Sequence, residues 1–255
     1  MYNFLRGLLE DKTGGVAFQC FGLFHIGVIV VFVTIAVLLC LFLKNKSKEK
    51  RNKIADLVIG IAFCVYVADF FLMPFAYQTI NIDKLPFHIC TTMCVMCFWS
   101  RHNAFLGKFR LQFAMFGFLS NLTYLMYPAA MMWMELHPLS YRVVQTLVFH
   151  GVMMVYGLIV LVYESQEFAW KKIYKDLGVI VAMTAWARLG NALYNNSEKE
   201  YNWFYVLQDP FGLFPRDISV YIAPFMNIAI FFSVALVVYW IISKAFVQSG
   251  KCKSA

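Results

Sequence analysis

Long apolar runs separated by short charged segments dominate the chain. The runs consist mainly of Phe, Leu, Val, Ile and Met, and a helix needs about 20 such residues to cross a hydrocarbon core of roughly 30 Å. No alternation of period two runs through them, so the pattern favours helices over a membrane barrel. We therefore predict an all-α, polytopic membrane bundle of about seven transmembrane helices, at residues 21–43, 54–77, 85–99, 109–127, 141–163, 177–194 and 218–242.

The pattern weakens at two places along the chain. The third run is short, so it either crosses obliquely or lies partly buried in protein. Phe4, Leu5, Leu8 and Leu9 recur at helical spacing, but charged residues follow at 10–12 before any long apolar run. This is typical of a short interfacial helix and not of a cleavable signal peptide. We expect an interfacial segment at 1–20, a single seven-helix domain at 21–246 and a cytoplasmic tail at 247–255.

Composition and charge place these helices in a membrane and orient them. Of the 255 residues, 61% are hydrophobic and only 14% are charged, which excludes an ordinary soluble domain. The basic residues concentrate in alternate loops, at 44–53, 101–110, 171–175 and 244–253. By the positive-inside rule these loops are cytoplasmic, so the N-terminus lies outside a multi-pass protein of the cell membrane. The net charge of +8 is then a topology signal, and no nucleic-acid partner is needed to explain it.

Several polar side chains interrupt the apolar runs. Burying such groups in hydrocarbon costs several kcal/mol each unless they meet partners or line a cavity, so each is a candidate functional residue. In the predicted orientation they fall in the outer part of the spans, and the inner halves contain almost nothing comparable. We expect one polar layer near the outer leaflet, formed by His25, Asp69, His88, Cys90, Asn121, His150, Arg188, Asn191 and Asn227.

A structural role is the alternative for most of these residues. His25 lies near a helix end and could simply reach the interface, and Asp69 could form an ion pair with Arg188. Asn121 is of a type that more often joins helices by hydrogen bonds than binds a ligand. His150 lies about ten residues inside its span, beside Gly151, which would let another helix or a ligand approach closely. For His150 a functional role is favoured.

The cysteines suggest a nucleophile more than a disulfide or metal framework. Six of the seven lie in apolar spans or at the membrane boundary, and the spacing of Cys90, Cys94 and Cys97 is that of a packing stripe on one helix face. Pro86 is suited to the first turn of a helix, which puts Cys90 within about one turn of that helix N-terminus. A thiol at this position would act as a nucleophile only with a base nearby to take its proton. His88 points elsewhere because it is two residues away, which leaves His150 as the base, or His88 as a base for a water or threonine nucleophile.

These residues occur in motifs with a family resemblance over essentially the whole chain. The motifs are Phe24-His25, the run Leu-Pro-Phe-His-Ile-Cys at 85–90, Phe149-His150, Asn191, and Asp209-Pro210-Phe211. In their order and spacing the chain resembles the YwaF-like integral membrane proteins. That family includes a vertebrate branch described as an ether-phospholipid acyltransferase with a cysteine nucleophile.

The resemblance implies roles for individual residues. It places His88, His150, Asn191 and Asp209 in the family's polar site, together with His25. In the vertebrate pattern the reactive cysteine directly precedes the histidine, a position that Phe87 holds here, whereas Cys90 follows two residues later as in bacterial relatives. Membership of the family would therefore not by itself imply that Cys90 forms an acyl-enzyme intermediate.

Two classes of function fit this sequence. The first is acyl transfer or hydrolysis on a membrane phospholipid or lipid-linked substrate near the outer leaflet, with His88, His150 and Cys90 as catalytic residues and with Asn121 or Asn191 stabilising an oxyanion. No cofactor is predicted, although three imidazoles, of His25, His88 and His150, with Asp209 would also satisfy a zinc site. The second class is a transporter or binding protein for a small solute. A scaffold would instead tolerate substitution of His150.

Overall fold

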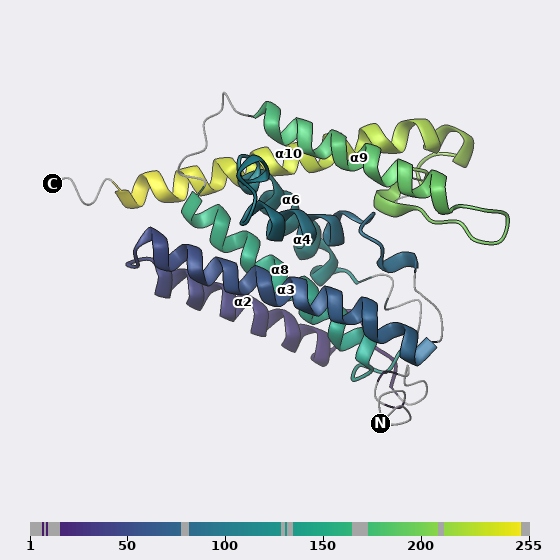
Figure 1. Cartoon of the computed structure of the whole chain (residues 1–255), viewed down its shortest axis with the longest axis horizontal. Coiled ribbons are helices and arrows are strands. Elements are labelled where there is room, and N and C mark those ends of the chain that lie inside the picture. The colour runs from purple at the N-terminus through teal and green to yellow at the C-terminus, as the bar shows by residue number, and fades with distance from the viewer. Residues whose placement is uncertain are drawn as a thin grey trace. The chain divides into compact units, whose positions relative to one another are not determined.

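The structure, a computed structural model, describes residues 7, 9, 16–77, 82–128, 131, 135–164, 173–208 and 212–250. Its longer elements follow the order of the predicted spans (Figure 1). They are α2 (Leu23–Leu43), α3 (Lys48–Tyr77), η1 (Ile82–Lys84), α4 (Ile89–Ser100), α5 (Ala104–Gly107), α6 (Arg110–Met126), α8 (Tyr141–Glu164), α9 (Tyr174–Tyr194), η4 (Trp203–Tyr205) and α10 (Arg216–Gly250).

Five of these helices are long and apolar enough to cross a membrane. They contain the segments Leu23–Leu43, Lys48–Leu72, Tyr141–Glu164, Tyr174–Tyr194 and Arg216–Ile242. The other two predicted spans are shorter helices. At about 1.5 Å per residue, the 12 residues of α4 extend about 18 Å and the 17 residues of α6 about 25 Å, both less than a hydrocarbon core. The helix α4 begins only at Ile89, because the peptide before it turns at Pro86–His88.

The chain folds as two compact units. Unit 1 comprises residues 1–85 and 120–159, and unit 2 comprises residues 86–119 and 160–255, so the division falls inside α6 and inside α8. Each unit is described by itself below.

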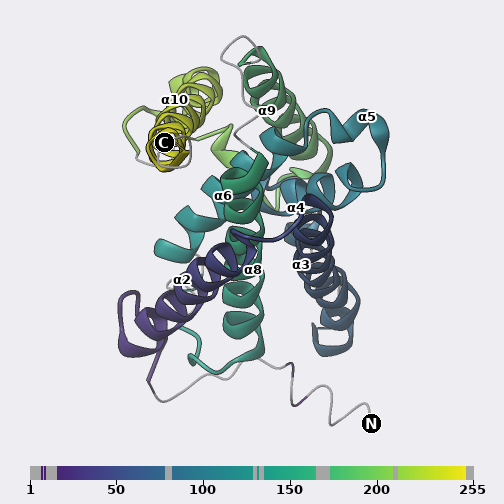
Figure 2. The same cartoon turned by 90° about the vertical axis from the view of Figure 1, so that its left-hand side faces the viewer.

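In unit 1, α8 packs against both α2 and α3. Phe32 of α2 lies directly over Gly151, where a Cβ atom would come within 2.4 Å of its ring. Tyr66 of α3 contacts Phe149, with ring centroids 6.1 Å apart. Figure 2 shows the corresponding arrangement, with α8 between α2 and α3. Arg51 closes the turn between α2 and α3 by donating to the last carbonyls of α2.

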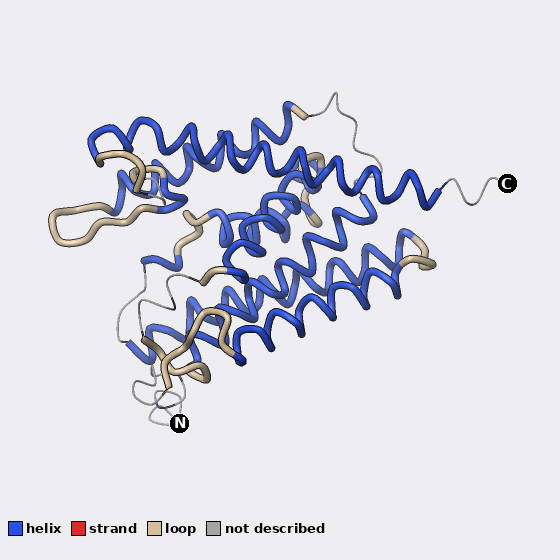
Figure 3. Tube along the Cα trace, turned by 180° about the vertical axis from the view of Figure 1, so that it is seen from behind, coloured by secondary structure: helices blue, strands red, loops and turns tan. Residues whose placement is uncertain are grey.

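In unit 2, α9 and α10 pack against one another, and η4, which lies between them in sequence, contacts both helices. At the other end of α9, Lys175 donates to the Lys108 carbonyl just before α6. Every described regular element of both units is a helix, with no strand among the described residues (Figure 3). The all-α prediction is confirmed.

Candidate functional site

The strongest candidate in unit 1 is His150, which is held on two sides by residues of α6. The ring nitrogen Nδ1 of His150 lies 2.7 Å from Oδ1 of Asn121, and both side chains are buried. The ring of Tyr124 stacks on the imidazole, with centroids 3.9 Å apart and an angle of 15° between the planes. The three residues come from two helices, with Asn121 and His150 29 residues apart in sequence, and together they fix the position and rotation of the imidazole.

The hydrogen bond to Asn121 also selects the tautomer of His150. Nδ2 of Asn121 donates to the Ser120 hydroxyl, which leaves Oδ1 facing the histidine. An amide oxygen only accepts, so Nδ1 of His150 carries the proton. In the neutral ring the lone pair is then on Nε2, the arrangement in which a histidine acts as a general base in Ser-His-Asp and Cys-His-Asn hydrolases.

His25, another buried histidine of unit 1, is held by backbone groups at both ring nitrogens. Its Nδ1 accepts from the backbone N–H of Phe21 at 2.9 Å, and its Nε2 donates to the Leu125 carbonyl at 2.8 Å. The side chain is completely buried and ties the start of α2 to the end of α6. Since both ring nitrogens are engaged by backbone groups, His25 is not available as a base or metal ligand in this structure.

The buried charge of Asp69, in α3, is compensated by a cation close to it in sequence. Its carboxylate is 1% exposed and forms a salt bridge of 2.7 Å with Lys84 of η1. Arg188, which the sequence suggested as a partner, is exposed on α9. The Asp69–Lys84 pair anchors η1 to α3, and Tyr66 adds a hydrogen bond to the Lys84 carbonyl at 2.8 Å.

An apolar groove lies on unit 1 beside the turn of α8 that precedes His150. Its volume is about 370 Å³, and side chains of α2 and α8 line it with almost no polar surface. Gly27 forms part of its wall, and nothing lies within 4 Å of where a Cβ of Gly27 would be. The lining residues are Leu23, Phe24, Gly27, Val28, Val31, Phe32, Val144, Leu147 and Val148. A groove of this composition fits a hydrocarbon chain.

In unit 2, His88 and Cys90 lie at the start of α4, where aromatic side chains hold the preceding residues. His88 is the N-cap of α4, without a side-chain hydrogen bond to the first turn. Phe87 is buried between the indoles of Trp186 and Trp203, with centroid distances of 5.0 and 4.8 Å. Its ring covers Gly190 so closely that a Cβ there would lie 2.4 Å from it.

The carbonyl of Pro86, just before α4, accepts two hydrogen bonds from side chains. Nε1 of Trp186 donates to it at 2.7 Å, and the Thr92 hydroxyl donates to it as well. The neighbouring hydroxyl of Thr91 donates to the His88 carbonyl at 3.1 Å. Both threonines therefore stabilise the first turn of α4, which is a structural role.

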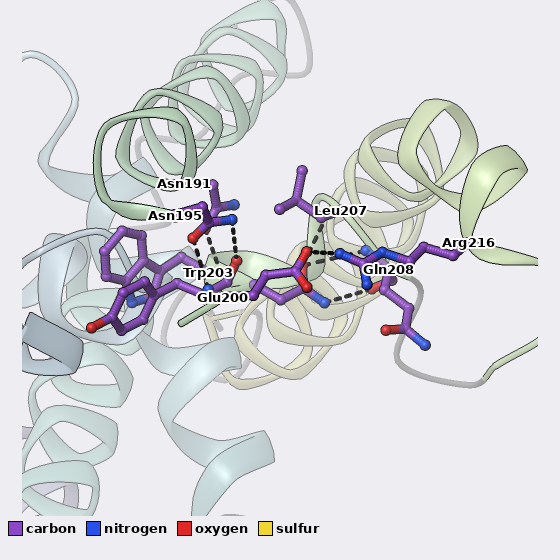
Figure 4. Close-up of polar contacts among 9 residues, drawn as sticks. Asn191, Asn195, Glu200, Trp203, Leu207, Gln208 and Arg216 are labelled. Atoms are coloured by element: carbon purple, nitrogen blue, oxygen red, sulfur yellow. Dashed lines mark hydrogen bonds and ion pairs between the residues drawn. The ribbon is translucent and has the colours of Figure 1, made fainter. Parts of the chain in front are cut away.

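Asn191 links α9 to the loop that follows it. Its Oδ1 accepts from the backbone N–H of Trp203 at 3.1 Å, and Figure 4 shows Asn191 and Asn195 of α9 directed toward this loop. Asn195 accepts from the N–H of Tyr201 at 2.7 Å and donates to its carbonyl at 3.1 Å. An ion pair between Glu200 and Arg216 closes the loop at its other end.

Two buried donors in this region have no acceptor among the described residues. They are Nδ2 of Asn191 and Nε1 of Trp203, in side chains that are each 1% exposed. Leaving a buried N–H without a partner costs about 1–3 kcal/mol. The N–H of Trp203 fixes the amide orientation of Asn191, so it is Nδ2 and not Oδ1 that remains available. The pair is therefore a candidate site for an acceptor oxygen.

The backbone of η4 is strained beside these donors. Phe204 and Tyr205 both have left-handed φ angles, 56° and 51°, which are unfavourable for bulky residues. Asn227 of α10 holds this conformation by donating Nδ2 to the carbonyls of Phe204 and Tyr205, at 2.6 and 3.0 Å. The Tyr205 phenol lies near Cys90, and partial burial, together with the Cys90 thiol, raises the pKa of Tyr205.

Comparison with known families agrees with the membrane architecture. The family model described as the TMEM164 family matches residues 20–244, which is most of the chain. The chain belongs to the TMEM164 family. No curated protein and no solved structure matches it. As a member of a membrane-protein family with several spanning-length apolar helices, it is a multi-pass membrane protein.

The match covers all the candidate residues, including Asp209, which lies outside the described residues. Among the described residues, no group of three His, Cys, Asp or Glu side chains could hold a metal ion.

One buried polar group of unit 2 was not among the predicted candidates. Asp176, two residues into α9, is completely buried, and Oδ1 accepts from the Tyr239 hydroxyl of α10 at 2.9 Å. Gln112 of α6 donates to Oδ2 at 3.4 Å. Asp176 lies one residue before the predicted span 177–194 and directly after Lys175, so the sequence placed it in a loop.

A second polar group surrounds Glu164 at the end of α8. Arg110 forms a salt bridge of 2.6 Å with its carboxylate, and Arg101 lies 3.6 Å from it. The Arg101 side chain is 3% exposed, although it lies in a segment that the sequence predicted to be a loop. The groups around Asp176 and Glu164 both join the ends of helices within unit 2, which indicates that they stabilise its packing.

Proposed function

We propose that this TMEM164-family protein is an integral membrane enzyme of lipid metabolism, which transfers or hydrolyses an acyl ester near the outer leaflet of the cell membrane. The observation that carries the proposal is the His150–Asn121 hydrogen bond of 2.7 Å, with Tyr124 stacked on the same imidazole. This bond protonates Nδ1 and puts the lone pair of the neutral ring on Nε2, which is the tautomer that general base catalysis through Nε2 requires. The YwaF-like resemblance and its acyltransferase branch support the same reaction class.

The reaction would use Nε2 of His150 as the proton acceptor. Nε2 removes the proton from an attacking hydroxyl or water, and that oxygen forms a bond to the ester carbonyl carbon. When the tetrahedral intermediate collapses, the bond to the glycerol oxygen breaks, and the imidazolium returns the proton to that oxygen. With an alcohol as the attacking group the products are a new ester and a lysolipid, and with water they are a fatty acid and a lysolipid.

Cys90 offers an alternative nucleophile for acyl transfer. A base takes the proton of the Cys90 thiol, the thiolate attacks the ester carbonyl carbon to form a thioester, and the glycerol oxygen leaves with that proton as the lysolipid. The acceptor hydroxyl then attacks the thioester, the carbon–sulfur bond breaks, and the hydroxyl proton passes through the base to the departing sulfur. The uncapped start of α4 places Cys90 in the first turn, where the helix dipole favours a thiolate. His88, as the N-cap, is the second histidine to be tested.

The apolar groove of unit 1 supports a lipid substrate. It lies on α2 and α8, where its lining residue Leu147 is three positions before His150 and on the same helix face, and its lining suits an acyl chain. A small polar solute would find almost no hydrogen-bond partner in such a lining.

The experiment is an acyl-redistribution assay on the purified protein in its lipids. Phospholipids with a deuterated acyl chain are added, and mass spectrometry follows labelled products for the parent, His150→Ala, His88→Ala and Cys90→Ala. We expect His150→Ala to lower the rate by about 10²–10⁴-fold, while the matched control His102→Ala, an exposed histidine, leaves it unchanged. Absence of redistribution and hydrolysis with every lipid class, together with solute uptake into proteoliposomes, would replace the enzyme by a transporter. Full activity in Cys90→Ala would remove only the thiol pathway.

A further inference from the structure

The loop after α9 brings two buried hydrogen-bond donors to the start of α4. We propose that Nδ2 of Asn191 and Nε1 of Trp203 bind the carbonyl oxygen of a lipid acyl ester. The inference rests on the proposed function and concerns unit 2 alone, where it makes Trp203 a substrate-binding residue. The argument depends on the orientation of each donor, the strained loop that carries Trp203 and the depth of both residues.

The orientation of Asn191 is determined by its backbone partner. The N–H of Trp203 donates to Oδ1 of Asn191, so the amide presents Nδ2 as its remaining polar group. Nδ2 is buried and has no acceptor among the described residues. A purely structural asparagine at a loop usually satisfies both ends of its amide, as Asn195 does here with the backbone of Tyr201.

The orientation of Trp203 follows from its ring contacts. Phe87 stacks on the indole at 4.8 Å and Tyr201 at 4.7 Å, with angles of 26° and 14° between the planes. Because both faces are in contact with aromatic rings, a ligand can reach the indole only at its edge, where Nε1–H is located. That atom too has no acceptor in the described part of the chain.

The strained backbone after Trp203 indicates that this arrangement is maintained for a reason other than stability. Two successive bulky residues, Phe204 and Tyr205, are held in left-handed conformations by Asn227. Strain of this kind persists where the surroundings enforce it, and it concentrates at ligand-binding and active sites. Here it fixes the residue directly after Trp203, and it also places the Tyr205 phenol near Cys90.

Depth and charge identify the ligand class. Asn191 lies three residues before the end of α9, a helix of spanning length, so it belongs at the boundary between hydrocarbon and headgroups. The two candidate groups are uncharged donors, which suits a neutral acceptor such as an ester carbonyl. They would also stabilise the negative oxygen that forms when that carbonyl is attacked. A lipid phosphate offers acceptor oxygens as well, and the experiment separates the two sources.

The test measures binding without turnover. Diheptanoyl phosphatidylcholine, which has ester carbonyls, is compared with its diether analogue, which keeps the phosphate and lacks the carbonyls. Affinities are obtained from the thermal stabilisation of the purified, detergent-solubilised protein. We expect the parent to bind the diester about tenfold more tightly than the diether. Equal affinities in the parent would overturn the proposal and assign the donors to another acceptor.

Variants then assign the preference to the two donors. Asn191→Asp keeps an acceptor oxygen for the N–H of Trp203 but removes the Nδ2 donor, and Trp203→Phe keeps a stacking ring but removes Nε1–H. Both should abolish the preference for the diester. The matched control is Trp186→Phe, since Trp186 stacks on the same Phe87 but already donates to Pro86. Loss of the preference in Trp186→Phe to the same extent would overturn the role of Nε1.

The outcome is distinguishable from that of the proposed function. A diester preference that depends on Asn191 and Trp203 supports the carbonyl site even if no acyl redistribution is found. Redistribution that depends on His150, without any diester preference in the parent, supports the enzyme and overturns the carbonyl site.

Discussion

Oδ1 of Asn121, in α6, accepts a hydrogen bond from Nδ1 of His150, in α8, at 2.7 Å. This bond places the lone pair of the neutral imidazole on Nε2. It makes Asn121 a positioning residue, whose contribution to catalysis passes through the histidine. The two roles can be separated by the choice of substitution.

We expect Asn121→Ala to lower the acyl-transfer rate about 100-fold, because the ring loses the acceptor that fixes its tautomer. Asn121→Asp retains an acceptor oxygen at the same distance and should recover most of the rate. Rates are measured by the deuterated-lipid assay and normalised to folded protein. If Ala and Asp substitutions had equal effects, the hydrogen bond would not orient the base.

His25 should behave differently from His150, because its two hydrogen bonds are to the backbone. His25→Ala removes both bonds and leaves a cavity at a completely buried position, so we expect the free energy of unfolding to fall by about 3 kcal/mol. The rate per folded molecule should remain within about twofold of the parent, since the bonds contribute through stability. Unfolding in detergent is followed by circular dichroism. A large loss of rate in fully folded His25→Ala would return this histidine to the catalytic group.

If an acyl chain of the substrate binds in the apolar groove, a substitution that fills the groove should change the acyl-chain length that the enzyme prefers. Gly27→Phe would place a ring in the groove, because Gly27 lines it and the position of a Cβ there is open. We expect long acyl chains to be used about tenfold less well relative to short chains, since each excluded methylene loses apolar contact. Mass spectrometry of mixed-chain lipids gives the ratio.

Gly60→Phe is the matched control for this substitution. Gly60 lies in α3, also has an open Cβ position and does not line the groove. The same shift in preference for both variants would indicate a general effect on packing and would count against an acyl chain in the groove.

The Asp69–Lys84 pair predicts a stability difference between buried and exposed ion pairs. Lys84→Met leaves the buried carboxylate of Asp69 without its cation, which should cost about 3 kcal/mol. Lys53→Met breaks the exposed pair with Glu49 and should cost less than about 0.5 kcal/mol. Chemical unfolding of the two variants gives the comparison, and equal costs would show that Lys84 does not compensate the buried charge.

The predicted orientation of the chain can be tested at the loop after α9. A cysteine at the exposed position of Glu198 should react with a membrane-impermeant maleimide in intact cells. A cysteine at Lys46 should react only after the membrane is permeabilised. Peptide-resolved mass spectrometry separates these sites from the native cysteines, and the opposite pattern would invert the assignment of leaflets.

The apolar pattern predicted the class of fold and the positions of the helices. It could not determine the length of α4, because Pro86 and the aromatic contacts of Phe87 delay the helix until Ile89. Helix positions depend on local hydrophobicity, which a sequence contains, whereas the start of α4 depends on Trp186 and Trp203, about 100 residues away.

The candidate residues were predicted better than their partners. His150 and Asn121 were both expected at membrane depth, but the bond between them was not, since nothing in a single sequence aligns α6 with α8. Asp69 was expected to need a cation, and the cation is Lys84 of a short 3-10 turn that hydropathy does not detect. Asp176 was overlooked because lysines precede it in sequence, although its side chain is buried and accepts a hydrogen bond from Tyr239 of α10.

Phe87 and Gly190 are also linked in how they can change over evolution. The ring occupies the volume that any side chain at position 190 would need, so a larger residue there requires a smaller one at 87. A lineage that places cysteine at position 87 frees that volume and loses an aromatic surface for Trp203. Substitutions at the two positions should therefore occur together among relatives, and the residue at 190 should indicate which of them place a thiol at position 87.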